Sequence, residues 1–459
     1  MGGDATARPL VAEAQPAGAP VAELAAGLAS RIRDRYSEAD VAELEEFLSG
    51  AGALDVPTLR SGLFSASVVG EASRYTGYQA VWVRDNVHIA HALWRCGRRH
   101  EAARAVSALC RWFHHERPRL DAAIARGAAP DDPMERPHVR FDGEAFREIA
   151  EPWNHAQNDA LGYFLWIASL LAEAGDLALD REDAALLGRL ALYLDAIRYW
   201  QDEDSGHWEE RPKLEASSVG TVAAGLRGLR RLLGGAGALD VPLGQGSRRL
   251  GPEDLDRSIE RGRRALEAIL PAECVQPDPE KHRRYDAALL FLVHPLQEVS
   301  GETAARIAAD VAENLLGAHG IRRYSGDTFW GPDYKTTVPE EDRTALEEKR
   351  EAVFRAQGEA PIRSGEEAQW CLFDSTLSSI HAARFLATGD ASALLAQTRH
   401  LNRALRQLVP VAAPRPGLRC PELYYLQGGR WVPNDVVPLL WAQANLSLAL
   451  KSARETAET

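Results

Sequence analysis

The sequence between residues 158 and 233 decides the fold. It reads NDALGYFLWIASLLA over 158–172, REDAALLGRLALYLDAIRYW over 181–200, DEDSGHWEERPKLEA over 202–216 and VGTVAAGLRGLRRLL over 219–233. Apolar residues recur at helical spacing in the first, second and fourth segments, whereas the third segment is polar and contains an indole and a glycine. The stretch therefore predicts a pair of helices, a long loop and a further helix.

The rest of the chain continues this alternation of helices and long loops. Helical periodicity predicts further helices at Val21–Arg33, Glu38–Leu48, Val81–Trp94, Glu101–Phe113, Pro252–Leu270, Thr303–Leu316, Glu367–Leu386, Ala391–Leu408 and Val436–Arg454. Long connections rich in aromatic residues and glycine lie at Arg60–Gln79, Pro133–Trp153, Asp202–Ala216, Ile321–Glu366 and Pro414–Pro433. Connections of this length are uncommon unless they carry function. We therefore predict an all-α fold, a ring of helical hairpins with few short strands, whose long loops gather at one end.

Two segments stand apart from this pattern. Residues 1–20 are rich in Ala, Gly and Pro, and we expect a flexible tail there, followed by a single domain over residues 21–459. Within that domain, residues 335–363 carry a dense run of charges, for which we expect a solvent-exposed helix or a lid. The sequence predicts no oligomeric state.

The composition excludes several classes of partner. A formal net charge of −13 argues against nucleic acid and anionic membranes, because phosphate groups are bound by clustered Lys and Arg. No run approaches the roughly 18 apolar residues of a membrane span, and we expect no signal peptide. The scattered cysteines form no C-x-x-C pair, so we expect a reducing cytoplasm and neither zinc nor redox chemistry.

Some segments place Trp or Tyr beside charged or amide side chains, namely Trp82–Asn86, Trp153–Asp159, Gly206–Arg211, Arg323–Tyr334, and Cys420–Tyr425 with Trp441 and Gln443. Sugars explain this mixture, because pyranose rings have apolar faces that stack on aromatic rings and hydroxyls that bind carboxylates, amides and guanidinium groups. Glycosidic bonds are hydrolysed by two carboxyl groups on opposite sides of the bond. The best placed candidates are Glu209 and Glu422, which have to meet through the fold.

Each motif also has a purely structural interpretation. Arg84 beside Asp85 at a helix start can form a local ion pair, and Asn158 or Asp159 can cap the helix that follows. Adjacent carboxylates after an indole are most often a solvated acidic turn. Single motifs are therefore weak, and their combination carries the functional interpretation.

We predict no metal site and no cofactor. His88 and His91 lie three residues apart on one predicted helical face, and His155 lies in a polar motif, but no third ligand is suitably spaced. The acidic runs that barrel-type terpenoid cyclases need are also missing from the sequence.

Taken in order, the motifs resemble the family 15 glycoside hydrolases, the glucoamylase family, and especially the glucoamylase-like domain of the phosphorylase kinase α and β subunits. The resemblance covers roughly residues 60–452. Glucoamylases resemble the chain at Arg84–Asp85, Trp153–Asp159, Trp208–Glu210, and Arg323–Tyr324 with Asp327. The kinase domains resemble it at Trp82–Asn86, Ala216–Gly220, Pro421–Tyr424, and Trp441 with Gln443.

This resemblance implies an (α/α)6 barrel and hydrolysis with inversion at the anomeric carbon. Glu209 is then the general acid, and Glu422 is the general base that activates water. The resemblance implies substrate binding by Trp82, Arg84, Asp85, Trp153, Gln157, Asp159, Trp208, Glu210, Arg323, Asp327 and Trp441. We expect burial and the neighbouring Glu210 to raise the pKa of Glu209. We also expect the two catalytic carboxyl groups to lie about 6.5 to 9.5 Å apart.

The implied function is that of an intracellular exo-acting α-glucoside hydrolase. It would release glucose from the non-reducing end of short malto- or isomalto-oligosaccharides, or of a disaccharide such as trehalose. We expect no starch-binding domain and no N-terminal β domain, so external starch is not the expected substrate. The alternative is a non-catalytic carbohydrate-sensing or regulatory module, because the kinase subunits also keep carboxylates at these motifs.

Overall fold

Six buried helices form a closed ring at the centre of the molecule. The computed structural model describes residues 19–68, 70–234, 237–343, 347–356, 362–412 and 416–459. The inner helices are α3 (Val83–Arg95), α6 (Asn158–Glu173), α8 (Ala216–Leu233), α10 (Leu290–Val293), α14 (Phe373–Thr388) and α16 (Leu440–Ala457). Each of them contacts the next along the chain, and α16 contacts α3, which closes the ring.

A second layer of helices surrounds this ring, with one outer helix before each inner helix in the sequence. The outer helices are α2 (Glu38–Gly50), α4 (Arg99–His115), α7 (Arg181–Ala196), α9 (Pro252–Ile269), α11 (Gly301–Asn314) and α15 (Ala391–Arg406). Each of them packs against one or two inner helices. The predicted all-α (α/α)6 barrel is therefore confirmed.

The distribution of apolar residues explains which helices lie inside. In the inner helix α6, every residue from Asn158 to Ser169 is buried. The outer helix α9 has instead one buried stripe, at the spacing that keeps a single helix face inward, and it consists of Leu255, Ser258, Gly262, Leu266 and Ile269. The opposite face of α9 carries exposed ion pairs such as Arg263 with Glu260.

Glycines allow α6 and α8 to pack closely in the ring. A Cβ atom on Gly162 would lie 2.7 Å from the backbone nitrogen of Val222, which is closer than real Cβ atoms approach. A Cβ atom on Gly225 would in turn overlap the carbonyl oxygen of Gly162. The tight contact between these two inner helices therefore depends on the missing side chains.

The long connections lead from an outer helix into the N-terminal end of the next inner helix. They span residues 51–82, 116–157, 197–215, 270–289, 315–372 and 407–439. The connections in the other direction are short at 96–98, 174–180, 294–300 and 389–390, and the one at 234–251 contains the hairpin of β4 (Leu239–Leu243) and β5 (Gly246–Leu250). The long connections and the positive ends of the inner helix dipoles therefore meet at the same end of the barrel.

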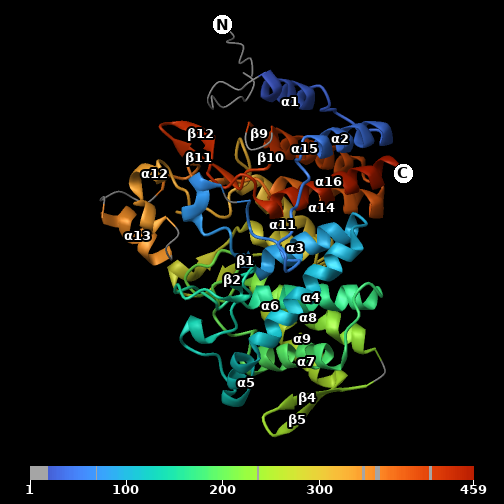
Figure 1. The fold of residues 1–459 in the computed structure, drawn as a ribbon, viewed down its shortest axis with the longest axis vertical. Coiled ribbons are helices and arrows are strands. Elements are labelled where there is room, and N and C mark those ends of the chain that lie inside the picture. The colour runs from blue at the N-terminus through green and yellow to red at the C-terminus, as the bar shows by residue number, and fades with distance from the viewer. Residues whose placement is uncertain (1–18, 69, 235–236, 344–346, 357–361, 413–415) are drawn as a thin grey trace.

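Short antiparallel strands and small helices brace the long connections. The strands pair as β1 (Val81–Trp82) with β2 (Arg140–Asp142), β2 with β3 (Arg147–Glu148), β6 (Cys274–Val275) with β7 (His282–Arg283), β9 (Val409–Val411) with β10 (Gly417–Arg419), and β11 (Leu423–Gln427) with both β12 (Arg430–Pro433) and β8 (Gln369–Trp370). The additional helices are α1 (Ala19–Ala29), α5 (Arg117–Arg126), α12 (Tyr334–Thr337) and α13 (Glu347–Ala356). In Figure 1, α12 lies near the β11–β12 hairpin.

Several elements differ from the sequence prediction, and one of them, α5 (Arg117–Arg126), was not predicted at all. The inner helix α10 and the connection before it were not predicted, because four residues are too few to show helical periodicity. The helix predicted from Glu367 begins only at Phe373, since residues 369–370 pair with β11 as a strand. The helix predicted from Val436 begins at Leu440, because Pro438 does not fit a helix interior.

Two further expectations concern segments that the structure describes only in part. The expected tail over residues 1–20 lies outside the described residues except for its last two positions. The charged insertion over 335–363 is described apart from residues 344–346 and 357–361, and it forms most of α12 and all of α13. In the described portion of the chain, no helix is both long and apolar enough to cross a membrane.

Candidate active site

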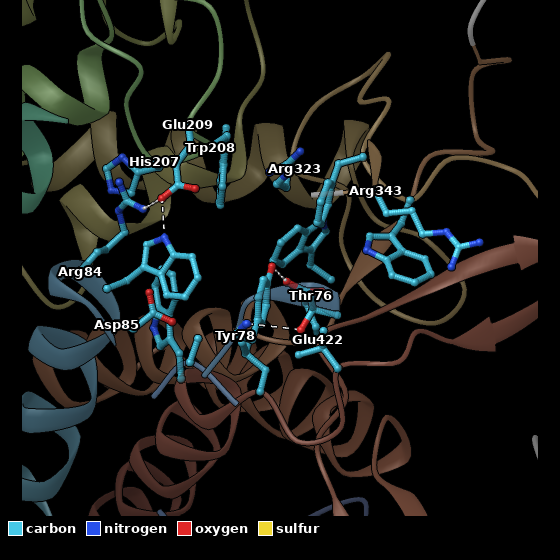
Figure 2. Close-up of a pocket in the computed structure, with 18 of the residues that line it drawn as sticks. Thr76, Tyr78, Arg84, Asp85, His207, Trp208, Glu209, Arg323, Arg343 and Glu422 are labelled. Atoms are coloured by element: carbon cyan, nitrogen blue, oxygen red, sulfur yellow. Dashed lines mark hydrogen bonds and ion pairs between the residues drawn. The ribbon is translucent and has the colours of Figure 1, made fainter. Parts of the chain in front are cut away.

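A cavity opens where the long connections meet the N-terminal ends of the inner helices (Figure 2). Nine residues predicted for the site line it, namely Trp82, Arg84, Asp85, Trp153, Trp208, Glu209, Arg323, Glu422 and Trp441. The four other predicted residues lie behind this lining and contact it, namely Gln157, Asp159, Glu210 and Asp327. The fold therefore gathers all of the predicted residues in and around one cavity.

Arg84, in the first turn of α3, is held by the neighbouring inner helix. Its Nε and Nη2 atoms donate to the two carboxylate oxygens of Asp159 at 2.5 and 3.1 Å. Nη2 also donates to Oε1 of Gln157 at 2.8 Å and to the carbonyl oxygen of Gly206 at 2.9 Å. Although burial acts to raise it, the charge of Arg84 keeps the pKa of Asp159 below its ordinary value. Asp159 and Gln157 thus position Arg84 and do not themselves face the cavity.

Glu209 is held at the opposite end of the same network. Its Oε1 atom accepts hydrogen bonds from Nε1 of Trp82 at 2.8 Å and from Nε2 of Gln157 at 3.3 Å, and it lies 3.8 Å from Nη1 of Arg84. Its backbone has a φ angle of +61°, in the left-handed region. That conformation costs a non-glycine residue about 1–2 kcal/mol. Its carbonyl oxygen accepts a hydrogen bond from Asn154 at 3.1 Å.

The pKa of Glu209 is raised, mainly by burial. The positive charges of Arg84 and Arg140 oppose this effect. The charge of Glu210, which was expected to contribute, is paired with Arg283, whose Nη2 atom donates to it at 2.7 Å. A buried carboxyl group with a raised pKa keeps its proton to higher pH, as a proton donor requires.

The turn before Glu209 requires a glycine. Gly206 has a φ angle of +52°, and a Cβ atom there would overlap the carboxylate of Glu215. Its carbonyl oxygen is the acceptor for Arg84. The glycine in the Gly-His-Trp-Glu-Glu motif therefore lets the backbone approach both side chains.

Glu422 comes from a different connection, at the residue before β11. Its backbone is fixed by hydrogen bonds from Cys371 to its carbonyl oxygen, at 2.9 Å, and from its nitrogen to the carbonyl oxygen of Val436, at 3.0 Å. Its carboxylate accepts hydrogen bonds from the hydroxyl of Tyr78 at 2.7 Å and from Nδ2 of Asn434 at 2.5 Å. Burial raises the pKa of Glu422 to about 7, against the lowering effect of these two donors. This group therefore changes its charge close to neutral pH.

The two carboxyl groups lie on different sides of the cavity. Figure 2 shows Glu209 and Glu422 apart from each other, with Arg84 and Asp85 grouped at one end. Burial also raises the pKa of Asp85 to about 7. A ligand in this cavity would meet one carboxyl group on either side, which suits proton donation at one face and water activation at the other.

Aromatic side chains form the walls of the cavity. Trp82 makes edge contacts with Tyr78 and Trp153, with ring centroids 5.4 and 6.1 Å apart. The indole nitrogens of Trp153, Trp370 and Trp441 are buried and have no hydrogen-bond partner in the described part of the protein. Buried donors of this kind are costly unless a ligand or water satisfies them.

Arg323 lies between a carboxylate and several of these rings. Its Nε and Nη2 atoms each donate to Asp327 at 2.6 Å. Its guanidinium carbon lies 5.0 Å from the ring centroids of Trp208 and Trp370 and 5.1 Å from that of Phe329. Asp327 therefore orients Arg323, and Arg323 is the member of the pair that lines the cavity.

Glu210 points away from the cavity, although it was predicted to bind substrate. Only 1% of its side chain is exposed, and its Oε2 atom lies 2.7 Å from Nη2 of Arg283 and 3.5 Å from Nζ of Lys213. Its Oε1 atom accepts a hydrogen bond from the hydroxyl of Tyr324. Burial acts to raise its pKa, but Arg283 and Lys213 outweigh that effect and lower the pKa to about 2.

Several residues of the site were missed by the sequence prediction. Those that line the cavity are Tyr78, Arg343, Arg350 and Trp370. Those that lie behind the lining and hold its side chains or their neighbours are Arg283, Asp286 and Asn434. Tyr78 lies inside a predicted functional loop, so its place beside the other aromatic residues was a usable signal. Asp286 lies in the connection that was not predicted, where it accepts hydrogen bonds from Nε1 of Trp208 at 2.9 and 3.1 Å.

The histidines that were considered as metal ligands are dispersed. His88 stacks on Trp441 with ring centroids 4.4 Å apart, and His155 stacks on His138 at 3.8 Å. His91 packs against Trp166 at 5.1 Å. Each of these imidazoles therefore packs against another aromatic ring.

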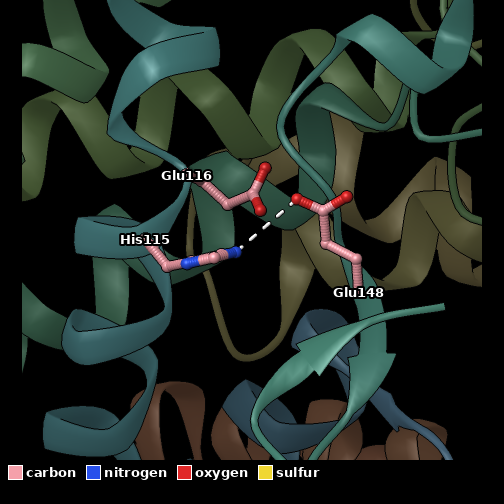
Figure 3. Close-up of side chains that lie close together, drawn as sticks. All are labelled: His115, Glu116 and Glu148. Carbon is pink, nitrogen blue, oxygen red and sulfur yellow. Dashed lines mark ion pairs between the residues drawn. The ribbon is translucent and has the colours of Figure 1, made fainter.

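Another cluster brings possible ligand atoms together away from the cavity. His115, Glu116 and Glu148 offer atoms within 4.8 Å of one another (Figure 3). Nη1 of Arg119 lies 3.3 Å from Glu116 and 2.6 Å from Glu148. The guanidinium group of Arg119 therefore forms ion pairs with both carboxylates.

The paired helices and the cavity among the long connections define the class of protein as an (α/α)6 barrel with a candidate active site at one end. Residues 50–413 match the model of the Glycosyl hydrolases family 15, and the chain belongs to that family. This confirms the family that the motifs predicted.

Similar proteins include both enzymes and regulatory subunits. A probable phosphorylase b kinase regulatory subunit alpha from Caenorhabditis elegans is 26% identical over 79% of this chain and 30% of its own length. An isomaltose glucohydrolase from Kribbella flavida is 27% identical over 56% of this chain and 64% of its own length. The chain thus spans less than two thirds of each of these relatives.

Solved structures share the fold. A wild-type glycosidase has a TM-score of 0.56 at 20% identity, and the match covers 95% of this chain and 98% of that one. A glucoamylase from Saccharomycopsis fibuligera has a TM-score of 0.55 at 13% identity, with 93% and 97% covered. A variant glycosidase in complex with glucose has a TM-score of 0.56 at 19% identity, with 95% and 98% covered.

Proposed function

We propose that the protein is an exo-acting, inverting α-glucoside hydrolase that releases glucose from the non-reducing end of short substrates. The observation that carries this proposal is the placement of Glu209 and Glu422 on different sides of one cavity, each with a raised pKa. Glu209 gives a proton to the leaving oxygen, and Glu422 takes a proton from the attacking water. Arg84 and Asp85 bind hydroxyls of the terminal sugar, and the tryptophans contact its ring faces.

Four residues that the family resemblance assigns to substrate binding receive other roles here. Gln157, Asp159 and Asp327 act as positioning residues, because each binds an arginine or glutamate of the lining. Glu210 is assigned a structural role in a buried ion-pair cluster. The lining residues Trp82, Trp153, Trp208, Arg323 and Trp441 keep their role in substrate binding.

The second candidate is a carbohydrate-sensing or regulatory module. The similarity to a phosphorylase kinase regulatory subunit favours it. A binding module has no chemical need for a proton donor and a base on either side of a bond, so the retained pair supports catalysis.

A substrate panel separates the two candidates. The purified protein is incubated with malto-, isomalto- and trehalose-type disaccharides, and the first glucose anomer is followed by NMR. Early release of β-glucose from one of them is the expected result. Binding without turnover across the panel would favour the sensor. Early release of α-glucose from the non-reducing unit of a malto- or isomalto-disaccharide would overturn the inverting mechanism, whereas inversion on trehalose gives one β-glucose and one α-glucose because its leaving group is itself an α-glucose.

The charged insertion supports a preference for short substrates, because it is anchored beside both carboxylates. Glu347 of α13 accepts a hydrogen bond from the backbone nitrogen of Arg211 at 2.7 Å, two residues after Glu209. Lys335 of α12 lies 2.7 Å from Asp435, next to the Asn434 that binds Glu422. We assign the insertion as a wall over the outer side of the cavity.

Removal of one side chain from this wall should favour longer substrates. Arg343 and Arg350 of the insertion line the cavity. Arg350→Ala is expected to raise the kcat/KM for a pentasaccharide relative to a disaccharide by up to about tenfold, roughly 1.4 kcal/mol in transition-state binding. Lys349→Ala on the same helix, where the lysine side chain is 63% exposed, is the matched control. An unchanged ratio in Arg350→Ala would remove the insertion as a determinant of chain length.

The acidic side of the pH profile should depend on Tyr78. Its hydrogen bond stabilises the ionised form of Glu422, so its loss raises the pKa of the base. Tyr78→Phe is therefore expected to move the acidic limb of kcat/KM to higher pH by about 0.5 to 1 pH unit. Tyr425→Phe removes a hydroxyl that contacts Gln427 and should leave the limb in place. A limb that moves to lower pH would contradict this role of Tyr78.

A further inference from the structure

Glu209 has a left-handed backbone conformation between two residues that are both tied to one neighbouring segment. The φ angle of +61° is unfavourable for glutamate, and such conformations persist only where the surrounding structure holds them. The residue before it is Trp208, with 7% exposure, and the residue after it is Glu210, with 1% exposure. The contacts of these two flanking residues therefore decide where the carboxyl group of Glu209 points.

Both contacts come from the connection before α10. Asp286 accepts the indole N–H of Trp208 with both carboxylate oxygens, at 2.9 and 3.1 Å. Arg283 donates from Nη2 to Glu210 at 2.7 Å and from Nη1 to Asp286 at 2.9 Å. One ion pair thus joins the residue before Glu209 to the residue after it.

The Arg283–Asp286 pair is itself rigidly placed. Asp286 is fully buried and caps the 3₁₀ turn Ala287–Leu289 by accepting from the nitrogen of Ala288 at 2.8 Å. Arg283 lies in β7, and its carbonyl oxygen accepts from the nitrogen of Glu273 at 2.9 Å. Its guanidinium carbon lies 3.4 Å from the centroid of the Tyr324 ring. The pair is anchored by a strand, a helical turn and an aromatic ring.

Neither residue lines the catalytic cavity, so the pair has no contact with a sugar bound there. Another arginine on the same segment, Arg284, pairs with Asp310 of the outer helix α11 at 3.0 Å. Two adjacent arginines of this segment thus each pair with a buried carboxylate. Arg283 lies beside the acid loop, whereas Arg284 lies on the outside of the barrel with 34% of its side chain exposed.

We propose that Arg283 and Asp286 are positioning residues that hold the carboxyl group of Glu209 at the bond to be cleaved. This role rests on the proposed function of Glu209 as the proton donor. The pair acts through the two flanking residues and not through contact with the substrate. Its loss should therefore weaken proton donation to the leaving group more than sugar binding.

A comparison of two substrates tests this role. An α-linked disaccharide needs a proton on its leaving oxygen, whereas the fluoride of α-glucosyl fluoride departs as a stable anion without one. Asp286→Asn places an amide N–H group opposite Arg283 and disturbs the pair. It is expected to lower kcat for the disaccharide roughly 10- to 100-fold, with less than about a threefold effect on the fluoride.

The controls separate positioning from stability. Asp310→Asn removes the matched carboxylate beside Arg284 and should affect the two substrates equally and weakly. Arg283→Lys keeps the positive charge but loses the forked geometry, and it should show the same selective loss as Asp286→Asn. If Asp286→Asn does not fold, the Arg283→Lys variant provides the test of the positioning role.

The outcomes are distinct for the two claims. Equal losses for disaccharide and fluoride in the folded variants would overturn the positioning role while leaving the proposed function intact. A wild-type protein that hydrolyses neither substrate would instead overturn the proposed function. Selective loss of disaccharide hydrolysis in Arg283→Lys or Asp286→Asn supports the positioning role.

Discussion

Glu422→Gln is expected to abolish hydrolysis of both an α-linked disaccharide and α-glucosyl fluoride, with kcat lowered about 10²- to 10⁴-fold for each. The amide of Gln cannot take a proton from water, and attack by water is required whichever group leaves. The substitution keeps the size of the side chain beside Tyr78 and Asn434. Initial rates of glucose release from both substrates provide the measurement.

The control for this variant is a second buried glutamate outside the cavity. Glu367 is 1% exposed and accepts the backbone nitrogen of Gly326 at 2.9 Å. Glu367→Gln should retain activity on both substrates in proportion to the folded fraction, which is followed by thermal unfolding. If a folded Glu422→Gln protein retained more than about a tenth of the wild-type kcat, Glu422 would not be the base.

Glu209→Gln is expected to separate the two substrates. The variant loses the proton donor, so kcat for the disaccharide should fall by about 10²- to 10⁴-fold. Hydrolysis of α-glucosyl fluoride should continue, since its leaving group needs no proton and Glu422 still activates water. The hydrogen bonds from Trp82 and Gln157 to Oε1 can be kept by the amide oxygen of the new side chain.

A carboxylate in the same connection gives the matched control. Glu203 pairs with Lys281 at the protein surface, and Glu203→Gln should hydrolyse both substrates at the wild-type rate. Equal loss of both substrates in a folded Glu209→Gln protein would exclude Glu209 as the proton donor. The two catalytic variants together distinguish an acid from a base without a bound ligand.

The helical pattern predicted most of the barrel, because eleven of its helices are long enough to show an apolar face or a continuous apolar run. Helical periodicity did not predict α10, because this inner helix has only four residues. It also failed at the starts of α14 and α16, where strand pairing at Gln369–Trp370 and a proline override the local pattern. Periodicity therefore predicted five of the six inner helices but not α10 and the connection before it.

The sequence predicted which residues belong to the site. It did not predict which of them line the cavity and which hold the lining residues in place. The motifs identified Arg84 and Asp159 together, yet only the fold shows that one lines the cavity and the other supports it. The two adjacent glutamates look equivalent in the sequence. The left-handed φ of Glu209 turns one of them into the cavity and leaves Glu210 among buried cations, a separation that spacing alone cannot reveal.

The arrangement of the connections has a consequence for how such proteins diverge. The chemistry depends on side chains carried by segments that enter one end of the barrel, whereas the ring depends on apolar helices and on contacts such as Gly162 with Val222. A descendant could exchange Glu422 for an amide, keep every helix, and still present a pocket that fits a sugar. Between a sugar-cleaving enzyme and a sugar receptor on this scaffold, the inherited difference can be a single oxygen atom.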